Sequence, residues 1–98
     1  MLESAYQARL IRYIKKLFPG CVVLKNDTDY QQGIPDLLIL HNGDWAMLEV
    51  KVRENAPEQP NQHHWVQLLN DMSYAAFIYP ENEEAVLNDL QLLFTPER

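Results

Sequence analysis

The chain has 98 residues, of which 47% are hydrophobic, and its formal net charge is −6. This length and composition predict one globular domain over residues 1–98. Because Cys21 is the only cysteine, an intrachain disulfide is excluded, which is compatible with a reducing cytoplasm. No apolar run is as long as a membrane span, and the first residues lack the basic and apolar segments of a signal peptide. We therefore expect a cytoplasmic protein that does not enter a membrane.

The charge is distributed unevenly along the chain. Residues 1–53 carry seven of the eight Lys and Arg together with six acids, whereas residues 54–98 carry one basic residue and eight acids. A negative chain is a poor candidate for a simple nucleic-acid binder, whose affinity comes largely from phosphate contacts. The distribution nevertheless allows the N-terminal half to face a polyanion while the C-terminal half faces solvent.

Apolar residues at helical spacing predict a first helix over residues 3–18. Ser4-x-x-Gln7 fits a capping box at its start, and Pro19-Gly20 ends it. The expected buried stripe contains Leu2, Tyr6, Leu10, Ile14 and Leu17. The basic residues Arg9, Arg12, Lys15 and Lys16 lie away from this stripe and have two open interpretations, as a solvated face or as contacts to a DNA backbone.

A short β-branched run predicts a strand over residues 21–24, and a polar loop follows over residues 25–33. Lys25 and Tyr30 are the loop residues that we expect to touch a substrate. Asp27 and Asp29 resemble metal ligands, but an Asx turn is the more ordinary role for an aspartate in such a loop.

The next segment predicts a β-hairpin. Residues 37–40 are an apolar run typical of a buried strand, Asp36 opens it, and Asn42-Gly43 suits a turn with positive φ. The returning strand covers residues 45–52, and its side chains alternate between two faces. One face is apolar and suits packing against a helix: Ala46, Leu48, Val50 and Val52. The other face ends in two charged groups: Trp45, Met47, Glu49 and Lys51.

Pairing of the hairpin brings Asp36 close to Glu49 and Lys51. Two neighbouring carboxylates repel each other unless a cation lies between them, and Mg²⁺ or Mn²⁺ suits oxygen ligands. A metal held in this way lowers the pKa of a bound water, and a lysine beside it orients that water or neutralises charge on a phosphate. The alternative interpretation is a solvated Glu-x-Lys ion pair on an exposed strand face, which contributes little.

The remaining residues predict a polar loop over residues 53–61, a helix from Gln62, a strand over residues 73–79, a last helix after Pro80 and a frayed tail over residues 95–98. We expect the strand to be parallel to its neighbour because a helix precedes it. His63 and His64 are expected to be exposed, and Trp65 to belong to the core. The expected apolar stripe of the middle helix is Trp65, Leu68, Leu69 and Met72. The predicted fold class is α/β, with the order α-β-β-β-α-β-α and a mixed four-stranded sheet.

Residues 2–80 of the chain resemble a known nuclease family. Pro35-Asp36 and Glu49-Val50-Lys51 match the signature of the PD-(D/E)XK nuclease superfamily. Gly33-Ile34-Pro35-Asp36-Leu37, Glu3-Ser4-x-x-Gln7 and Gln62-x-x-Trp65 are similar to the small stand-alone form of the VRR-NUC family of phages and bacteria. The resemblance implies a restriction-endonuclease-like αβββαβ core followed by a C-terminal helix, in a bacterial or phage-infected cell.

The resemblance also implies roles for individual residues. It implies a divalent-metal-dependent DNA endonuclease that hydrolyses phosphodiester bonds with Mg²⁺ or Mn²⁺. The catalytic residues implied are Asp36, Glu49, Lys51 and Gln62, and the metal site implied is Glu3, Asp36, Glu49 and the carbonyl of Val50. The residues expected to touch nucleic acid are Lys25, Tyr30, Arg53, Arg9 and Arg12.

Stand-alone members of this family resemble Holliday-junction resolvases, so we expect a homodimer, joined through its first or last helix, that prefers branched DNA. The alternative function is a catalytically weak nucleic-acid-binding or protein-interaction module on the same fold. Retention of Asp36, Glu49 and Lys51 together favours the enzyme. A third interpretation, a plain α/β adaptor whose acidic last helix binds a basic partner, is supported only by the net charge.

Overall fold

Three helices and four strands follow one another along residues 1–96, the part of the chain that this computed structural model describes. Their order confirms the predicted α-β-β-β-α-β-α arrangement, and part of the tail expected over residues 95–98 lies outside the described residues. The elements are α1 (Glu3–Leu17), β1 (Val22–Lys25), β2 (Leu37–His41), β3 (Asp44–Val50), α2 (Gln62–Met72), β4 (Tyr74–Ile78) and α3 (Glu83–Phe94).

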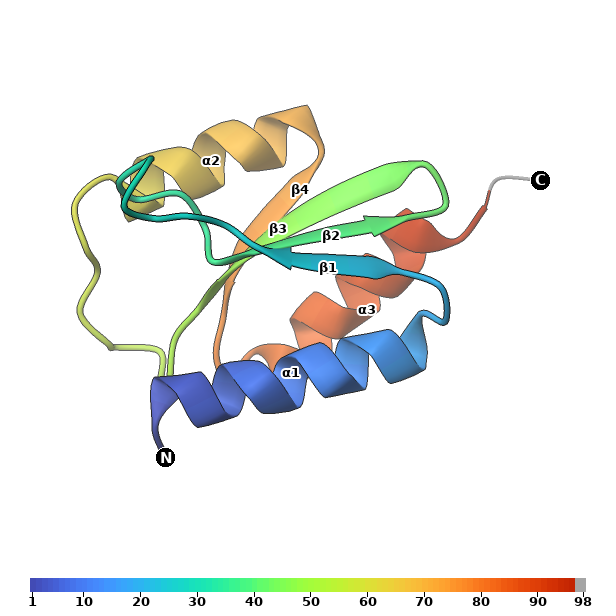
Figure 1. Cartoon of the computed structure of the whole chain (residues 1–98), viewed down its shortest axis with the longest axis horizontal. Helices are drawn as coiled ribbons and strands as arrows, with labels where there is room; N and C mark the ends of the chain where they lie inside the picture. The colour runs from blue at the N-terminus through green and yellow to red at the C-terminus, as the bar shows by residue number, and fades with distance from the viewer. Residues whose placement is uncertain (97–98) are drawn as a thin grey trace.

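The strands form one mixed sheet in the order β1-β2-β3-β4. The β1–β2 and β2–β3 pairs are antiparallel and the β3–β4 pair is parallel, as predicted. Figure 1 shows that α2 lies over one face of the sheet, whereas α1 and α3 lie side by side over the other. The molecule therefore has three layers, with the sheet in the middle.

The turn between β2 and β3 has the chemistry that the sequence predicted. Asn42 and Gly43 both have positive φ, at 51° and 82°, the conformation of a two-residue turn that matches the twist of its strands. The Asn42 side-chain amide also donates to the carbonyl of Phe94 at 2.9 Å. This bond ties the hairpin to the end of α3.

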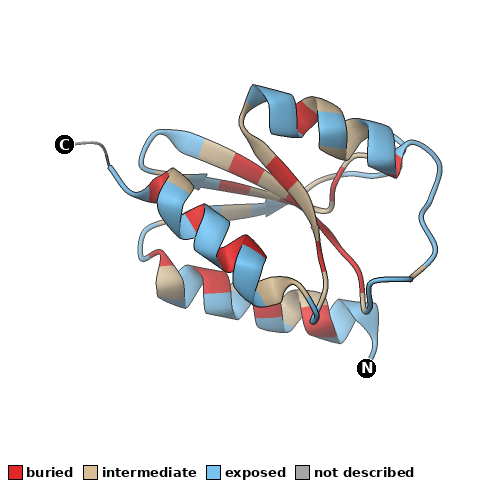
Figure 2. Ribbon diagram, turned by 180° about the vertical axis from the view of Figure 1, so that it is seen from behind, coloured by how far each residue is buried: buried red, intermediate tan, exposed pale blue. Residues whose placement is uncertain are grey.

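The core lies between the sheet and the layer of α1 and α3. Ala46, Leu48 and Val50 of β3 are completely buried there, as predicted for this face. Val52, the fourth residue predicted for it, lies beyond the strand, because β3 ends at Val50 rather than at residue 52. Figure 2 shows buried residues recurring along α1 and α3 on the sides that meet the sheet. The core side chains of α1 are Tyr6, Leu10 and Ile14, and those of α3 are Val86, Leu87, Leu90 and Phe94.

Two details of the helices differ from the sequence prediction. The capping box of Ser4 and Gln7 is wrong, because α1 begins at Glu3 and its N-cap is Leu2, which has no side-chain cap. Leu2, which was predicted in the buried stripe, is the N-cap and is 75% exposed. The predicted apolar stripe of α2 is also mostly wrong: only Leu69 of that set is buried, and Trp65 is half-buried rather than a core residue.

None of the helices in the described part of the chain is long and apolar enough to cross a membrane.

Candidate active site

Hairpin register places Asp36 beside the end of β3. Leu37 is the partner of Leu48, so Asp36, one residue before β2, reaches the level of Glu49 and Val50. The Val50 amide donates to Asp36 Oδ2 at 3.0 Å, which takes the place of a further ladder bond. Asn26 holds the backbone that leads into β2. Its backbone amide donates to the Asp36 carbonyl and its side-chain amide donates to the Pro35 carbonyl, both at 2.8 Å.

Glu49 is a carboxylate in the interior of the protein. Its exposed fraction is 2%, although it lies on the face of β3 opposite the core, because α2 covers this end of the strand. Glu49 Oε2 accepts a hydrogen bond from Gln62 Nε2 at 2.8 Å. Glu49 Oε1 is buried and has no hydrogen-bond partner among the described residues. A buried carboxylate oxygen without a partner is costly, so this atom points to a missing proton or cation.

Gln62 has a fixed orientation. The backbone amide of Gln59 donates to Gln62 Oε1 at 2.8 Å, so the NH₂ group of Gln62 faces Glu49. Its exposed fraction is only 7%, and it is the first residue of α2. The first turn of α2 and the loop before it therefore hold the Glu49 carboxylate from the side opposite Asp36. Gln62, which the resemblance implies as a catalytic residue, thus lies beside Glu49.

Lys51 follows Glu49 on the same face and is also buried, at 7% exposure. Its ammonium donates to the Pro57 carbonyl at 3.0 Å and lies 3.7 Å from Glu49 Oε2. The interpretation of Glu49 and Lys51 as a solvated surface pair is therefore wrong. Both charges are removed from water, and such burial destabilises a protein unless the charges are well paired.

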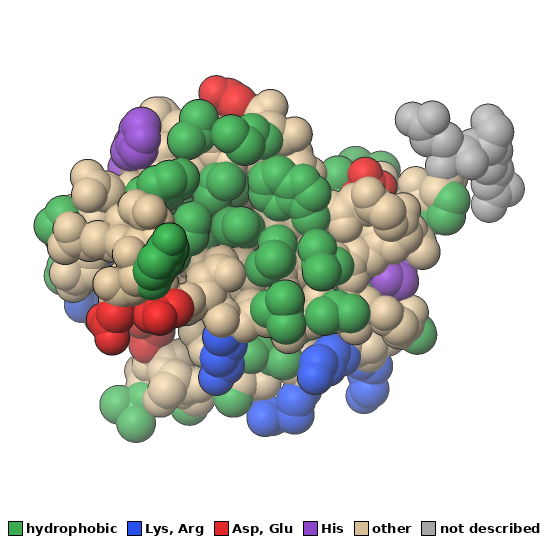
Figure 3. Space-filling model, turned by 45° about the horizontal axis from the view of Figure 1, so that its top comes forward, with side chains coloured by type: hydrophobic (Ala, Val, Ile, Leu, Met, Phe, Trp, Pro, Cys, Tyr) green, Lys and Arg blue, Asp and Glu red, His purple; other side chains and the backbone are tan. Residues whose placement is uncertain are grey.

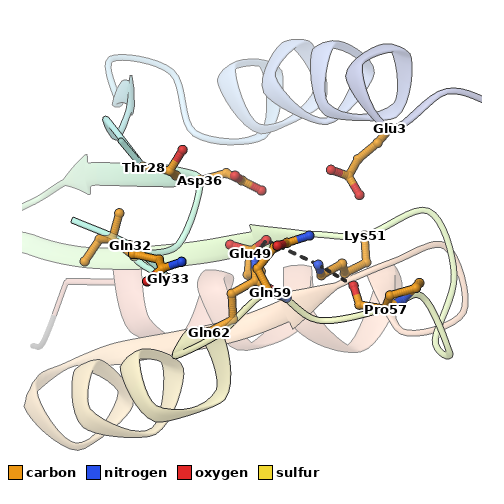
Figure 4. Close-up of a pocket in the computed structure, with 11 residues that line it drawn as sticks. Glu3, Thr28, Gln32, Gly33, Asp36, Glu49, Lys51, Pro57, Gln59 and Gln62 are labelled. Atoms are coloured by element: carbon orange, nitrogen blue, oxygen red, sulfur yellow. Dashed lines mark hydrogen bonds and ion pairs between the residues drawn. The ribbon is translucent and has the colours of Figure 1, made fainter. Parts of the chain in front are cut away.

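These side chains line a pocket of about 510 Å³. Figure 4 shows Asp36, Glu49 and Lys51 at its centre, with Glu3 reaching in from the start of α1. Thr28 and Gln32 come from the loop before β2, and Gln59 from the loop before α2. Sequence reasoning missed these three residues because uncharged polar side chains in loops carry no recognisable motif. Only the packing of the two loops brings them to the pocket.

Burial raises the pKa values of both central carboxyls, and the negative charge of Asp36 adds to the rise for Glu49. The pKa of Glu49 rises to about 8, chiefly because the group is buried and further because Asp36 and Glu3 are negative. The pKa of Asp36 also rises through burial, although the Val50 amide and Lys51 oppose that change. At neutral pH, without a cation between them, the pair therefore retains a proton. A divalent ion would replace that proton.

The donor set fits a hard divalent ion in part. Asp36 and Glu49 supply carboxylate oxygens, one of them the unpartnered Oε1, and oxygen donors are what Mg²⁺ and Mn²⁺ prefer. Within residues 1–96, no group of three or more His, Cys, Asp or Glu side chains is arranged to hold one ion. Glu3 thus lines the pocket without closing a three-carboxylate cluster. Mg²⁺ commonly keeps several waters, so two carboxylates are a workable protein contribution.

The residues predicted to touch nucleic acid lie outside this pocket. Lys25, Tyr30, Arg12 and Arg53 are exposed. Arg9 instead pairs with Glu83 at 3.3 Å, across from α1 to α3. His63 and His64 are exposed, as expected, and Asp27 forms the predicted Asx turn by accepting from the amides of Asp29 and Tyr30.

Comparison of the chain with models of protein families, with curated proteins and with solved structures finds no match.

Proposed function

We propose that this protein is a divalent-metal-dependent DNA endonuclease with a restriction-endonuclease-like core, related to the VRR-NUC branch of the PD-(D/E)XK nucleases. The observation that carries the proposal is the buried, unpartnered Oε1 of Glu49, which lies in a pocket with a second carboxylate and a lysine. A structural ion pair has no need for this arrangement, because it leaves one oxygen unsatisfied and two acids side by side. A divalent metal bound between the two acids would satisfy that oxygen and remove the repulsion between the carboxylates.

In the proposed site, Asp36 and Glu49 would hold Mg²⁺ or Mn²⁺, with the Val50 carbonyl and Glu3 as further oxygen donors near the pocket. A bound ion supplies Lewis-acid stabilisation of the phosphate and lowers the pKa of a bound water. Gln62 holds Glu49 in place through its 2.8 Å hydrogen bond. The Val50 amide does the same for Asp36. Rotation of either carboxylate is thereby restricted before substrate arrives.

Lys51 is the group suited to act on the attacking water and on the charged phosphate. Its ammonium is held by the Pro57 carbonyl, so its position beside Glu49 Oε2 is set by the backbone. A fixed positive charge in a partly dry pocket stabilises developing negative charge more strongly than one in water. Lys51 therefore orients the water and neutralises charge on the phosphorane.

The proposed substrate is DNA with a branched structure. The exposed Lys25, Tyr30, Arg12 and Arg53 are available for contacts to its backbone, and Arg9 is available when it leaves Glu83. Phosphate contacts fix position without reading bases, so a chain of this size suits recognition of DNA shape. Two opposing strands of a junction are cut most simply by a homodimer with two sites.

The test is cleavage of a labelled four-way junction and a matched linear duplex, with Mg²⁺, Mn²⁺ or EDTA. Wild type is compared with Lys51→Ala, and with Gln62→Ala against its matched control Gln67→Ala, an exposed glutamine of the same helix. We expect metal-dependent cleavage that Lys51→Ala reduces by about 10³-fold, equivalent to roughly 4 kcal/mol of transition-state stabilisation.

Three other outcomes have distinct meanings. Equal cleavage of both substrates retains the nuclease and removes the junction preference. Cleavage that persists in EDTA, or in Lys51→Ala, contradicts the proposed chemistry. A folded protein that binds DNA without cutting it under any condition identifies the binding module instead.

A further inference from the structure

A second, smaller pocket lies next to the candidate active site, on the side of β4. Its volume is about 190 Å³, and Lys51 lines both pockets. Phe77 of β4 is the register partner of Glu49. One step further along, the Lys51 amide donates to the Ile78 carbonyl at 2.9 Å, which brings Tyr79 beside Lys51. Lys51 therefore stands between the two pockets, and we refer to the smaller one as the β4 pocket.

Three rings line the β4 pocket, those of His63, Phe77 and Tyr79. His63 is the second residue of α2, and its ring centroid lies 6.3 Å from that of Phe77, with 24° between the two ring planes. Asn82 holds the end of β4, because its side chain donates to the Phe77 carbonyl and accepts from the Tyr79 amide, both at 2.9 Å. The backbone that presents Phe77 and Tyr79 is therefore fixed before any ligand arrives.

The loop between β3 and α2 adds two carboxylates to the β4 pocket, the exposed Glu54 and Glu58. These acids and His63 do not form a second metal centre, because no group of three His, Cys, Asp or Glu within residues 1–96 is arranged to hold an ion. Carboxylates accept hydrogen bonds from N–H groups and repel phosphates. The Lys51 ammonium in turn opposes a cation. The pocket is thus suited to an uncharged planar group that carries N–H donors.

We propose that the β4 pocket receives one unpaired nucleobase of a DNA whose phosphate lies in the active-site pocket. Aromatic side chains stack on the face of any base, and a glutamate accepts a hydrogen bond from the amino group of cytosine. Pockets for drug-sized ligands measure roughly 300–1,000 Å³, so the β4 pocket suits a single ring system better than a whole nucleotide. The inference rests on the proposed function, because it takes DNA as the substrate and Lys51 as the neighbour of the cleaved phosphate.

The hydrophobic area over β1 and β2 is less suited to a base. Figure 3 shows a continuous area of hydrophobic side chains there, and its exposed aliphatic members are Val22, Leu24 and Leu40. Their side chains have no hydrogen-bonding group with which to contact the edge of a base. At the β4 pocket, rings and acceptors occur together, beside the lysine of the proposed reaction. A base enters such a pocket only when it is unpaired, which gives the proposed preference for branched DNA a physical cause.

The test measures binding of the whole chain to two forked DNA duplexes by fluorescence anisotropy, in EDTA so that no metal-dependent cleavage occurs. The forks have the same duplex and the same number of phosphates, but their single-stranded arms carry either cytosines or abasic sites. Phosphate contacts are then equal, so the ratio of the two affinities reports contacts to bases. The variants are His63→Ala and Phe77→Leu. The matched control is His64→Ala, because His64 is exposed on the same helix and does not line the pocket. Circular dichroism checks that every variant is folded.

We expect wild type and His64→Ala to bind the cytosine fork at least fivefold more tightly than the abasic fork. This ratio should fall toward one in His63→Ala and Phe77→Leu. Equal binding of the two forks by wild type, or no binding to either, overturns the inference, as does a ratio that both pocket variants leave unchanged. Equal binding accompanied by changes in the NMR signals of the pocket residues on adding arginine amide identifies a pocket for a cationic side chain instead.

Failure of this inference is distinguishable from failure of the proposed nuclease, because affinity is measured without cleavage. A protein that cleaves DNA but binds the two forks equally overturns the base pocket and leaves the nuclease standing. A preference for the cytosine fork that depends on His63 and Phe77, in a protein that cleaves no DNA, supports the base pocket and contradicts the nuclease.

Discussion

The two faces of the sheet use the same strands for different purposes. On the side of α1 and α3, residues 46, 48 and 50 of β3 are completely buried in an apolar core. On the side of α2, the same strand presents Met47 and Glu49, and Lys51 follows directly after its end. On this side β1 and β2 also carry exposed aliphatic side chains. One face is closed and stabilises the domain. The other contains a buried polar site, where Glu49 and Lys51 lie in the interior, and leaves part of β1 and β2 exposed.

The largest expected effect on stability comes from truncating a core residue of β3, compared with its neighbour on the opposite face of the sheet. Leu48→Ala opens a cavity beneath a side chain that is 0% exposed and should lower the free energy of unfolding by about 3 kcal/mol. Met47→Ala removes a half-buried side chain and should cost about 1 kcal/mol. Urea unfolding of both variants beside wild type measures the two losses. Equal losses would mean that the α2 side is packed as tightly as the core.

The pH dependence of stability should expose the repulsion within the acidic pair. Because the pKa of Glu49 is about 8 in the folded protein and ordinary when unfolded, the folded state binds more protons between about pH 4.5 and 8. The free energy of unfolding of the metal-free protein should therefore fall as pH rises through this window. The raised pKa of Asp36 acts in the same direction.

Glu49→Gln removes most of that decline, so the variant should be more stable than wild type at pH 8 and lack catalytic activity. Glu84→Gln, at an exposed position of α3, should follow the wild-type curve. The measurement is urea unfolding from pH 5 to 9 in EDTA. Adding Mg²⁺ should restore stability to wild type more strongly at pH 8 than at pH 6, and should not stabilise Glu49→Gln. If the free energy of unfolding of the wild type does not change with pH, the acidic pair does not retain a proton at neutral pH.

A smaller effect is expected where the loop before β2 touches α2. Gly33 has a φ of +88°, and a Cβ there would lie 2.7 Å from the backbone carbon of Asn61. Gly33→Ala should cost about 2 kcal/mol and reduce cleavage, because the two loops that line the pocket are forced apart. Gly43→Ala is the control: its φ of +82° is similar, but nothing lies within 4 Å. Gly43→Ala should lower the free energy of unfolding through backbone strain alone and leave cleavage unchanged. Parallel unfolding and cleavage assays measure both variants.

The smallest effect is expected at the exposed ion pair between α1 and α3. Arg9→Ala breaks a 3.3 Å contact with Glu83, and Glu83 keeps its hydrogen bond from Tyr6. The loss should be no more than about 0.5 kcal/mol and should decrease with added salt. Thermal unfolding at low and high ionic strength tests this. A loss of several kcal/mol would show that the basic side of α1 is structural rather than available to DNA.

The fold was largely predictable because its signals are local. Helical spacing in α1, the apolar run of β2 and the Asn42-Gly43 turn each act over a few residues, and together they predicted the correct element order and strand pairing. The predicted capping box was wrong because a cap depends on the exact residue at which the helix begins, and the apolar spacing does not determine that residue. The predicted buried stripe of α2 was mostly wrong because apolar spacing does not show how much of the sheet a helix covers.

The meeting of Asp36, Glu49, Lys51 and Gln62 could be predicted from the sequence, since a hairpin with a two-residue turn allows one register and the resemblance added the glutamine. The burial of Glu49 and Lys51 could not, because it depends on α2 lying over the end of β3. Packing of the two loops brings Thr28, Gln32 and Gln59 to the pocket, and the position of α2 leaves part of β1 and β2 exposed. Pattern along a chain determines which side chains share a face, whereas the area that a distant helix shields from water is set by packing between layers.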